Sequence, residues 1–359
     1  MQNHLVKTTL NIKTQFFTFP ATFIAPTWAK GYKCEAGICG LCCLTASPGN
    51  FPHRPFAKLD RSICAHYDVK RRLCKKHSER HPVCKMYPFL FGVEDGQVLI
   101  STCLECPATN RESNIEPKVL LEVFESPDFS QQLILMNDYY EHAILSPYIW
   151  GGADHIWHTL TKQIQDFFSR KTEFPFLSEF RNILVNTVTD SPGITSKIPP
   201  IPPIAKLASR AEHYIATKFE SSGICLVKAN GPKTMIVLFD ENLKRKKAVK
   251  MKTPTKSLDL KIERAAHKLL NDYVSLICNR PFLSLATRMT TTIKPHIPVP
   301  IYLLNALAGS FVPLEIGATL IATRDKLKAI DRDTMREIIS LCEAAMLSRF
   351  RRPDAIMRR

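Results

Sequence analysis

The sequence YKCEAGICGLCC, at residues 32–43, places four cysteines within ten residues: Cys34, Cys39, Cys42 and Cys43. The two glycines between them let the backbone turn tightly and let amide N–H groups point at sulfur. Four thiolates this close repel one another unless a cation lies between them. Zinc and iron–sulfur clusters are the partners that thiolates select. The stretch therefore predicts a small, irregular domain built around a metal.

Five more cysteines follow before residue 107, and basic residues surround those between 64 and 84. Nearby cations offset the negative charge of a metal–thiolate centre. Residues 1–13 lack the long apolar run of a secretory signal, so we expect a cytoplasmic, reducing location. Dense cysteines in such a compartment favour metal binding over disulfides. The predicted metal ligands are Cys34, Cys39, Cys42, Cys43, Cys74, Cys84 and Cys106, together with Cys64 and Cys103.

The remaining cysteines lie far apart in apolar runs. They are Cys225, Cys278 and Cys342. Free cysteine in such a setting behaves as a small buried hydrophobe. We expect these three to be buried and chemically inert.

The motif CGLCC at residues 39–43 is followed by Cys74 and then by ERHPVCKMYPF at residues 79–89. In this order the residues resemble the YkgJ-type cysteine-cluster family, which is described as a zinc- or iron-chelating domain. The resemblance covers about residues 30–110 and implies metal chelation there. Two features depart from the family pattern. The gap before Cys39 is four residues rather than two, and His81 is inserted in the arginine–proline motif.

A second resemblance concerns the spacing Cys34-x4-Cys39-x2-Cys42. It is similar to that of plant-type ferredoxins, which hold a 2Fe–2S cluster. Cys43 and the cysteines beyond it have no role in that fold. The similarity favours an iron–sulfur cluster as the cofactor and leaves zinc as the alternative. Among the histidines, His77 is the candidate to complete the site.

Prolines mark a boundary near the middle of the chain. Residues 191–205, SPGITSKIPPIPPIA, hold five prolines and one glycine, which exclude a helix or a central strand. We predict a Pro-rich linker at 190–205. It separates a cysteine-cluster metal-binding domain with following helices, at 1–189, from a basic domain at 206–359. The fold class is α+β, with a β-hairpin and helices in the basic domain.

Periodicity predicts the regular elements. Apolar residues at helical spacing predict helices around 119–124 and 156–168, a helix beginning at Ser257, and a last helix over 333–350. Strands are expected within 15–24 and at 224–228, 234–239 and 246–251, with a hairpin turn at Asn230-Gly231. The apolar stretch 297–323 is interrupted by a glutamate and prolines, so we predict a buried helix and turn rather than a membrane span.

The net charge of +16 is concentrated in the second half. Residues 191–359 hold 29 Lys and Arg against 14 Asp and Glu. Residues 244–252 alone carry six cations beside the predicted hairpin. A basic strand can follow a phosphate backbone, but lysines also protect exposed strand edges. A polyanion or nucleic acid is therefore one possible partner of residues 244–252, and no membrane partner is expected.

Together these patterns predict a protein that holds iron or zinc through its clustered cysteines, with a structural or electron-transferring role. Two alternatives stay open. Some relatives of the YkgJ-type family are lysine N-methylases that act on flagellin, and the resemblance permits a similar enzyme here. A polyanion-binding module stabilised by metal is the other. The sequence carries no phosphate-binding loop, dinucleotide fingerprint, zinc-protease motif or nucleophile elbow, so it identifies no catalytic residue.

Overall fold

The computed structural model describes a large part of the chain. It covers residues 5–31, 66–68, 70–71, 73–76, 79, 88–94, 96–104, 106, 109, 115–127, 129–131, 133–134, 137, 153–189, 214–218, 223–230, 233–239, 245–280 and 299–350. The statements below concern these residues.

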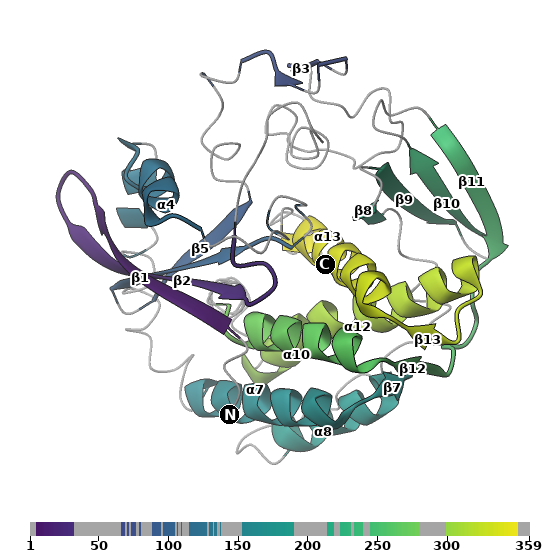
Figure 1. The fold of residues 1–359 in the computed structure, drawn as a ribbon. Coiled ribbons are helices and arrows are strands. Elements are labelled where there is room, and N and C mark those ends of the chain that lie inside the picture. Colours follow the sequence, from purple (N-terminus) through teal and green to yellow (C-terminus); the bar gives the residue numbers. More distant parts are fainter. Residues whose placement is uncertain are drawn as a thin grey trace.

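A four-stranded sheet forms the amino-terminal part (Figure 1). Its strand order is β1 (Leu5–Lys13), β2 (Thr18–Pro26), β6 (Gln97–Thr102) and β5 (Phe89–Glu94). Strands β1 and β2 form an antiparallel hairpin, β2 runs parallel to β6, and β5 runs antiparallel to β6. The sequence predicted strand structure within 15–24 but did not predict β1. Residues 15–17 belong to the turn.

Helix α4 (Pro117–Phe124) contributes to the core of this sheet. The Phe124 ring lies 5.4 Å from the Phe91 ring and 6.3 Å from the Phe89 ring, both on β5. Leu120 and Phe124 are buried, as the helical spacing predicted. Aromatic burial of this kind is a large part of what stabilises a small sheet.

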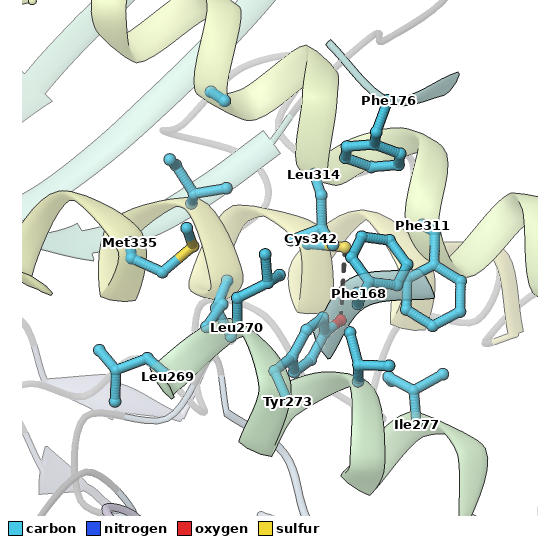
Figure 2. Close-up of a cluster of buried hydrophobic side chains, with 14 of the residues drawn as sticks. Phe168, Phe176, Leu269, Leu270, Tyr273, Ile277, Phe311, Leu314, Met335 and Cys342 are labelled. Atoms are coloured by element: carbon cyan, nitrogen blue, oxygen red, sulfur yellow. Dashed lines mark hydrogen bonds between the residues drawn. The ribbon is translucent and has the colours of Figure 1, made fainter. Parts of the chain in front are cut away.

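Five helices contribute to the largest buried cluster and lie beside and below the sheet in Figure 1. They are α7 (Ala153–Arg170), α8 (Leu177–Thr189), α10 (Arg264–Cys278), α12 (Val299–Asp325) and α13 (Arg332–Phe350). Phenylalanines from α7, α8, α12 and the segment before α8 stack together there. Figure 2 shows part of this cluster, in which the Phe168 ring lies 5.0 Å from Phe176 and 5.2 Å from Phe311.

The predicted helices at 156–168 and 333–350 are confirmed as α7 and α13. The predicted start at Ser257 is wrong, because α10 begins at Arg264. Residues Leu260–Ile262 instead form strand β12, which pairs with β7 (Glu173–Phe174) and β13 (Ala329–Ile330). Leu260 and Ile262 are buried and Lys261 between them is exposed. This alternation with a period of two suits a strand and not a helix.

The apolar stretch 297–323 forms α12, a helix of 27 residues with Pro313 inside it. The helix was predicted, and the described residues from Val299 onward continue it without the predicted turn. All side chains from Phe311 to Ala322 are buried, so packing on every side overrides the local preference of proline. None of the helices that the structure describes is long and apolar enough to cross a membrane.

A second sheet, shown at the upper right of Figure 1, has the order β11-β10-β9-β8. Its strands are β8 (Tyr214–Lys218), β9 (Gly223–Asn230), β10 (Lys233–Phe239) and β11 (Arg245–Lys252). The predicted hairpin is confirmed, but its turn was predicted one residue too early. Asn230 is the last residue of β9 and pairs with Lys233, so the two connecting positions are 231 and 232. The third predicted strand is confirmed as β11, which forms one edge of the sheet.

The chain is therefore an α+β protein. Its largest buried cluster combines residues from before the predicted linker, such as Ile24 and Phe168, with residues after it, such as Tyr273 and Ile338. The linker itself, 190–205, lies outside the described residues, and the division of the chain there stays a prediction. The shared core nevertheless shows that the two halves pack against each other.

Candidate functional site

The C-x-x-C pair lies at the end of strand β6, in a turn held by its own backbone. Cys103 and Cys106 are 1% and 5% exposed, and they are not joined in a disulfide. The N–H of Cys106 donates to the carbonyl of Cys103 at 3.2 Å. The Thr109 hydroxyl donates to the carbonyl of Cys106 at 2.8 Å and lies 3.3 Å from that of Cys103. Two thiols are thus held in one buried turn.

The sheet brings the ends of three strands together at this turn. Because β2 and β6 are parallel, their carboxyl ends lie at one edge, and the amino end of antiparallel β5 lies there too. The chain leaves β2 toward Cys34, enters β5 after Cys84 and leaves β6 at Cys103.

Contacts tie the ends of these strands together. The N–H of Cys103 donates to the carbonyl of Pro88 at 2.7 Å, and the N–H of Ile115 donates to that of Lys30 at 2.9 Å. Trp28 and Ala29, after β2, belong to the same buried cluster as Cys103. The described residues that flank the cysteine-rich segments therefore meet at one place.

Beside the turn lies a buried ion pair between helices α10 and α13. Arg280, which follows α10, donates from Nη1 and Nη2 to the two carboxylate oxygens of Glu343 at 2.7 and 2.8 Å. Both side chains are fully buried. Tyr273 donates to Glu343 at 3.0 Å and lies 3.3 Å from the sulfur of Cys342, the contact drawn in Figure 2. The bidentate geometry is the strongest form of this interaction.

The pair also holds the backbone on both sides of Cys103. Arg280 Nη2 donates to the carbonyl of Thr102 at 2.7 Å, and the N–H of Leu104 donates to Glu343 Oε2 at 3.1 Å. A cation therefore binds the residue before the cysteine, and an anion binds the residue after it. The position of Cys103 is fixed by side chains more than 170 residues away in the sequence.

Burial and neighbouring charges shift the pKa values of Arg280 and Tyr273. Burial by itself lowers the pKa of Arg280, but the Glu343 carboxylate, with smaller contributions from Tyr273 and Cys103, raises it above its ordinary value. Burial raises the pKa of Tyr273 far above its ordinary value, and Cys342 and Glu343 add to the effect. Arg280 thus stays charged, and Tyr273 stays a neutral hydrogen-bond donor.

The cysteines expected to be inert fit that expectation where the structure describes them. Cys278 and Cys342 are buried, and burial raises the pKa of the Cys278 thiol well above its ordinary value. A thiol that resists deprotonation is a poor nucleophile. The side chain of Cys225, on β9, lies outside the described residues.

Most of the predicted metal ligands also lie outside the described residues. These are Cys34, Cys39, Cys42, Cys43, Cys64 and Cys84, and the same holds for His77. Cys74 is half-buried on strand β4 (Leu73–Cys74), whose partner β3 (Tyr67–Asp68) stands apart from the sheet in Figure 1. Among the three predicted ligands that the structure describes, Cys103 and Cys106 lie in one turn, and Cys74 lies on a separate hairpin. No group of three or more metal-binding side chains occurs within the part of the chain that the structure describes.

Sequence analysis missed Arg280 and Glu343. Neither belongs to a motif, and the pair forms only when α10 and α13 pack. The sequence offered one signal. Glu343 directly follows Leu341 and Cys342, which were predicted to lie on the inward face of the last helix. A buried carboxylate at such a position requires a partner.

The basic residues at 244–252 lie on or beside the edge strand β11. Lys247, Lys250 and Lys252 are exposed there. Exposed lysines on an edge strand suit a polyanion and equally suit protection of the edge.

Comparison of the chain with protein-family models, with curated proteins and with solved structures found no match in any of the three.

Proposed function

We propose that this chain is a metal-binding protein whose amino-terminal cysteines hold iron, as an iron–sulfur cluster, or zinc. The observation that carries the proposal is the buried Cys103–Cys106 turn, at the edge of the sheet where segments leading to the other cysteines begin or end. Clustered thiolates select these metals. The proposed ligands are Cys34, Cys39, Cys42, Cys43, Cys74, Cys84 and Cys106, with Cys64 and Cys103.

The thiols of Cys103 and Cys106 suit such a metal. They are separated by two residues, the spacing common in zinc and iron–sulfur sites. They are also buried and not joined in a disulfide. A bound metal would supply either a structural cross-link or, as an iron–sulfur cluster, an electron carrier.

Covalent geometry allows two of the remaining proposed ligands, Cys34 and Cys84, to lie near this turn. Cys34 follows Gly31 by three residues, which an extended chain spans in at most about 11 Å. Cys84 precedes Pro88 by four residues, or at most about 14 Å. Since Pro88 is hydrogen-bonded to Cys103, the turn is within reach of Cys84.

Two substitutions test the proposal. Cys39→Ser and Cys84→Ser in the full chain should each reduce bound iron or zinc, measured by elemental analysis after anaerobic purification. Cys278→Ser is the matched control, because its buried thiol belongs to the helical core, and it should leave the metal content unchanged. Full metal retention by both Cys39→Ser and Cys84→Ser would refute the assignment.

A second candidate function rests on the exposed lysines of β11. A polyanion bound along this edge would be released as salt increases. Charge reversal of Lys247, Lys250 and Lys252 should abolish salt-dependent retention of the full chain on immobilised nucleic acid. Retention that is absent in the unsubstituted chain, or insensitive to salt, would end this candidate. The lysine N-methylase alternative gains no support from the residues that the structure describes.

A further inference from the structure

We infer that the Arg280–Glu343 ion pair is a positioning device for the Cys103–Cys106 turn, so that the carboxy-terminal helices control the thiol ligands of the amino-terminal metal centre. The inference rests on the proposed function. It assigns a role in metal binding to two residues that belong to no motif and lie outside the cysteine-rich region.

The first argument is where the pair acts on the backbone. Arg280 binds the carbonyl of Thr102 at 2.7 Å, and Glu343 binds the N–H of Leu104 at 3.1 Å. Cys103 lies between these two anchored peptide groups. Its own N–H donates to Pro88 at 2.7 Å, so its main chain is fixed from three directions. Groups that orient a ligand in this way strengthen metal binding without touching the metal.

The second argument is how rigid the pair is. Glu343 receives two bonds from Arg280, one from Tyr273 and one from Leu104. Arg280 and Tyr273 come from the end of α10 and from its body, and Glu343 comes from α13. Both helices belong to the largest buried cluster, which also contains Cys103 and Leu104. The turn is therefore anchored to the largest buried cluster.

The test uses the full chain with Co²⁺ as the probe, because thiolate-to-cobalt absorption reports sulfur ligation directly. Arg280→Met combined with Glu343→Leu removes both charges and leaves neither buried alone. This double variant should bind Co²⁺ about 10–100-fold more weakly than the unsubstituted chain. Its thiolate absorption per bound cobalt should also fall.

The matched control is the Arg324–Glu337 pair, which joins α12 to α13 with a shortest contact of 2.6 Å and is also largely buried. Neither residue contacts the cysteine turn. Arg324→Met combined with Glu337→Leu should therefore leave Co²⁺ affinity and thiolate absorption unchanged. Loss of a buried pair from α13 is common to both variants, so a difference between them isolates the contact with the turn.

The outcomes separate the inference from the proposed function. Unchanged affinity and absorption in the Arg280–Glu343 double variant overturn the inference, while the metal site stands. Absence of thiolate absorption in the unsubstituted chain after removal of any resident metal, together with absence of iron, sulfide and zinc from the chain as purified, overturns the proposed function and the inference with it. Should the double variant fail to fold, Glu343→Gln, which keeps the side-chain shape, is measured in the same way. Equal Co²⁺ binding by folded Glu343→Gln and the unsubstituted chain would then overturn the inference.

Discussion

The buried pair of Arg280 and Glu343 makes a quantitative prediction about stability. Arg280→Met removes two bonds to Glu343, at 2.7 and 2.8 Å, and one to the carbonyl of Thr102 at 2.7 Å. It leaves a fully buried carboxylate without its guanidinium. Breaking a buried ion pair from one side costs about 3–5 kcal/mol, because the remaining charge is uncompensated. A domain is stable by only about 5–15 kcal/mol, so the variant should be close to unfolding.

The assay is urea unfolding of the full chain, arranged as a double-mutant cycle. Arg280→Met and Glu343→Leu should each lose about 3–5 kcal/mol. The double variant should lose far less than the sum, since two apolar side chains can replace a buried pair at little cost. The control is Lys171→Met. The Lys171–Glu179 pair has a similar N–O distance, 2.8 Å, but Glu179 is 57% exposed, so its loss should cost less than about 1 kcal/mol. Equal costs for Arg280→Met and Lys171→Met would refute the reasoning.

Three further predictions concern the helical core. Glu315 accepts the N–H groups of Phe176 and Leu177 at 2.8 Å each, so Glu315→Ala should cost at least about 2 kcal/mol in urea unfolding, and Glu315→Gln less. Hydrogen bonds from the hydroxyl and the N–H of Thr334 hold the pKa of Asp331 below its ordinary value of 3.8. The ionised Asp331 therefore stabilises the folded chain above pH 3.8, and this contribution is lost as the pH falls through the lowered pKa. Asp331→Ala should therefore lower the free energy of unfolding by about 1 kcal/mol near neutral pH, as expected for a helix cap. The difference from the unsubstituted chain should become smaller in acid. A difference that does not change with pH would contradict this prediction. Phe168→Ala should cost about 3–5 kcal/mol in the same assay through the cavity it leaves, whereas Phe16→Ala, at a side chain 70% exposed, should change stability by less than about 0.5 kcal/mol.

Sequence patterns predicted the elements that short-range chemistry determines. The β9–β10 hairpin followed from Asn230-Gly231, and α13 followed from the helical spacing of Ile338, Leu341 and Cys342, all of which are buried. In such cases the turn chemistry or the period of the apolar residues is sufficient.

Two elements were missed, each for a different reason. Strand β1 was not predicted, because the turn that joins it to β2 lacks glycine and asparagine. That turn is held instead by Thr14, whose hydroxyl oxygen accepts the N–H of Phe17 at 2.9 Å. The first turn predicted for α10 became β12, because strands β7 and β13 from distant parts of the chain pair with it.

The candidate site also has residues that the sequence identified and residues that it did not. Clustering and spacing nominated Cys103 and Cys106 without any structure, since thiol chemistry is visible in sequence. The Arg280–Glu343 pair could not be nominated, because its partners are 63 residues apart and meet only after the helices pack. The metal-binding roles of all nine amino-terminal cysteines stay predictions.

The most direct test of the account is analysis of metal and sulfide in the full chain purified without oxygen, together with its absorption spectrum. We predict bound iron with inorganic sulfide and broad charge-transfer absorption, or bound zinc in its place. In either case the thiols at the amino-terminal cysteines should be protected from alkylation. Protein without metal, whose amino-terminal cysteines all react as free thiols or are paired in disulfides, would contradict the account.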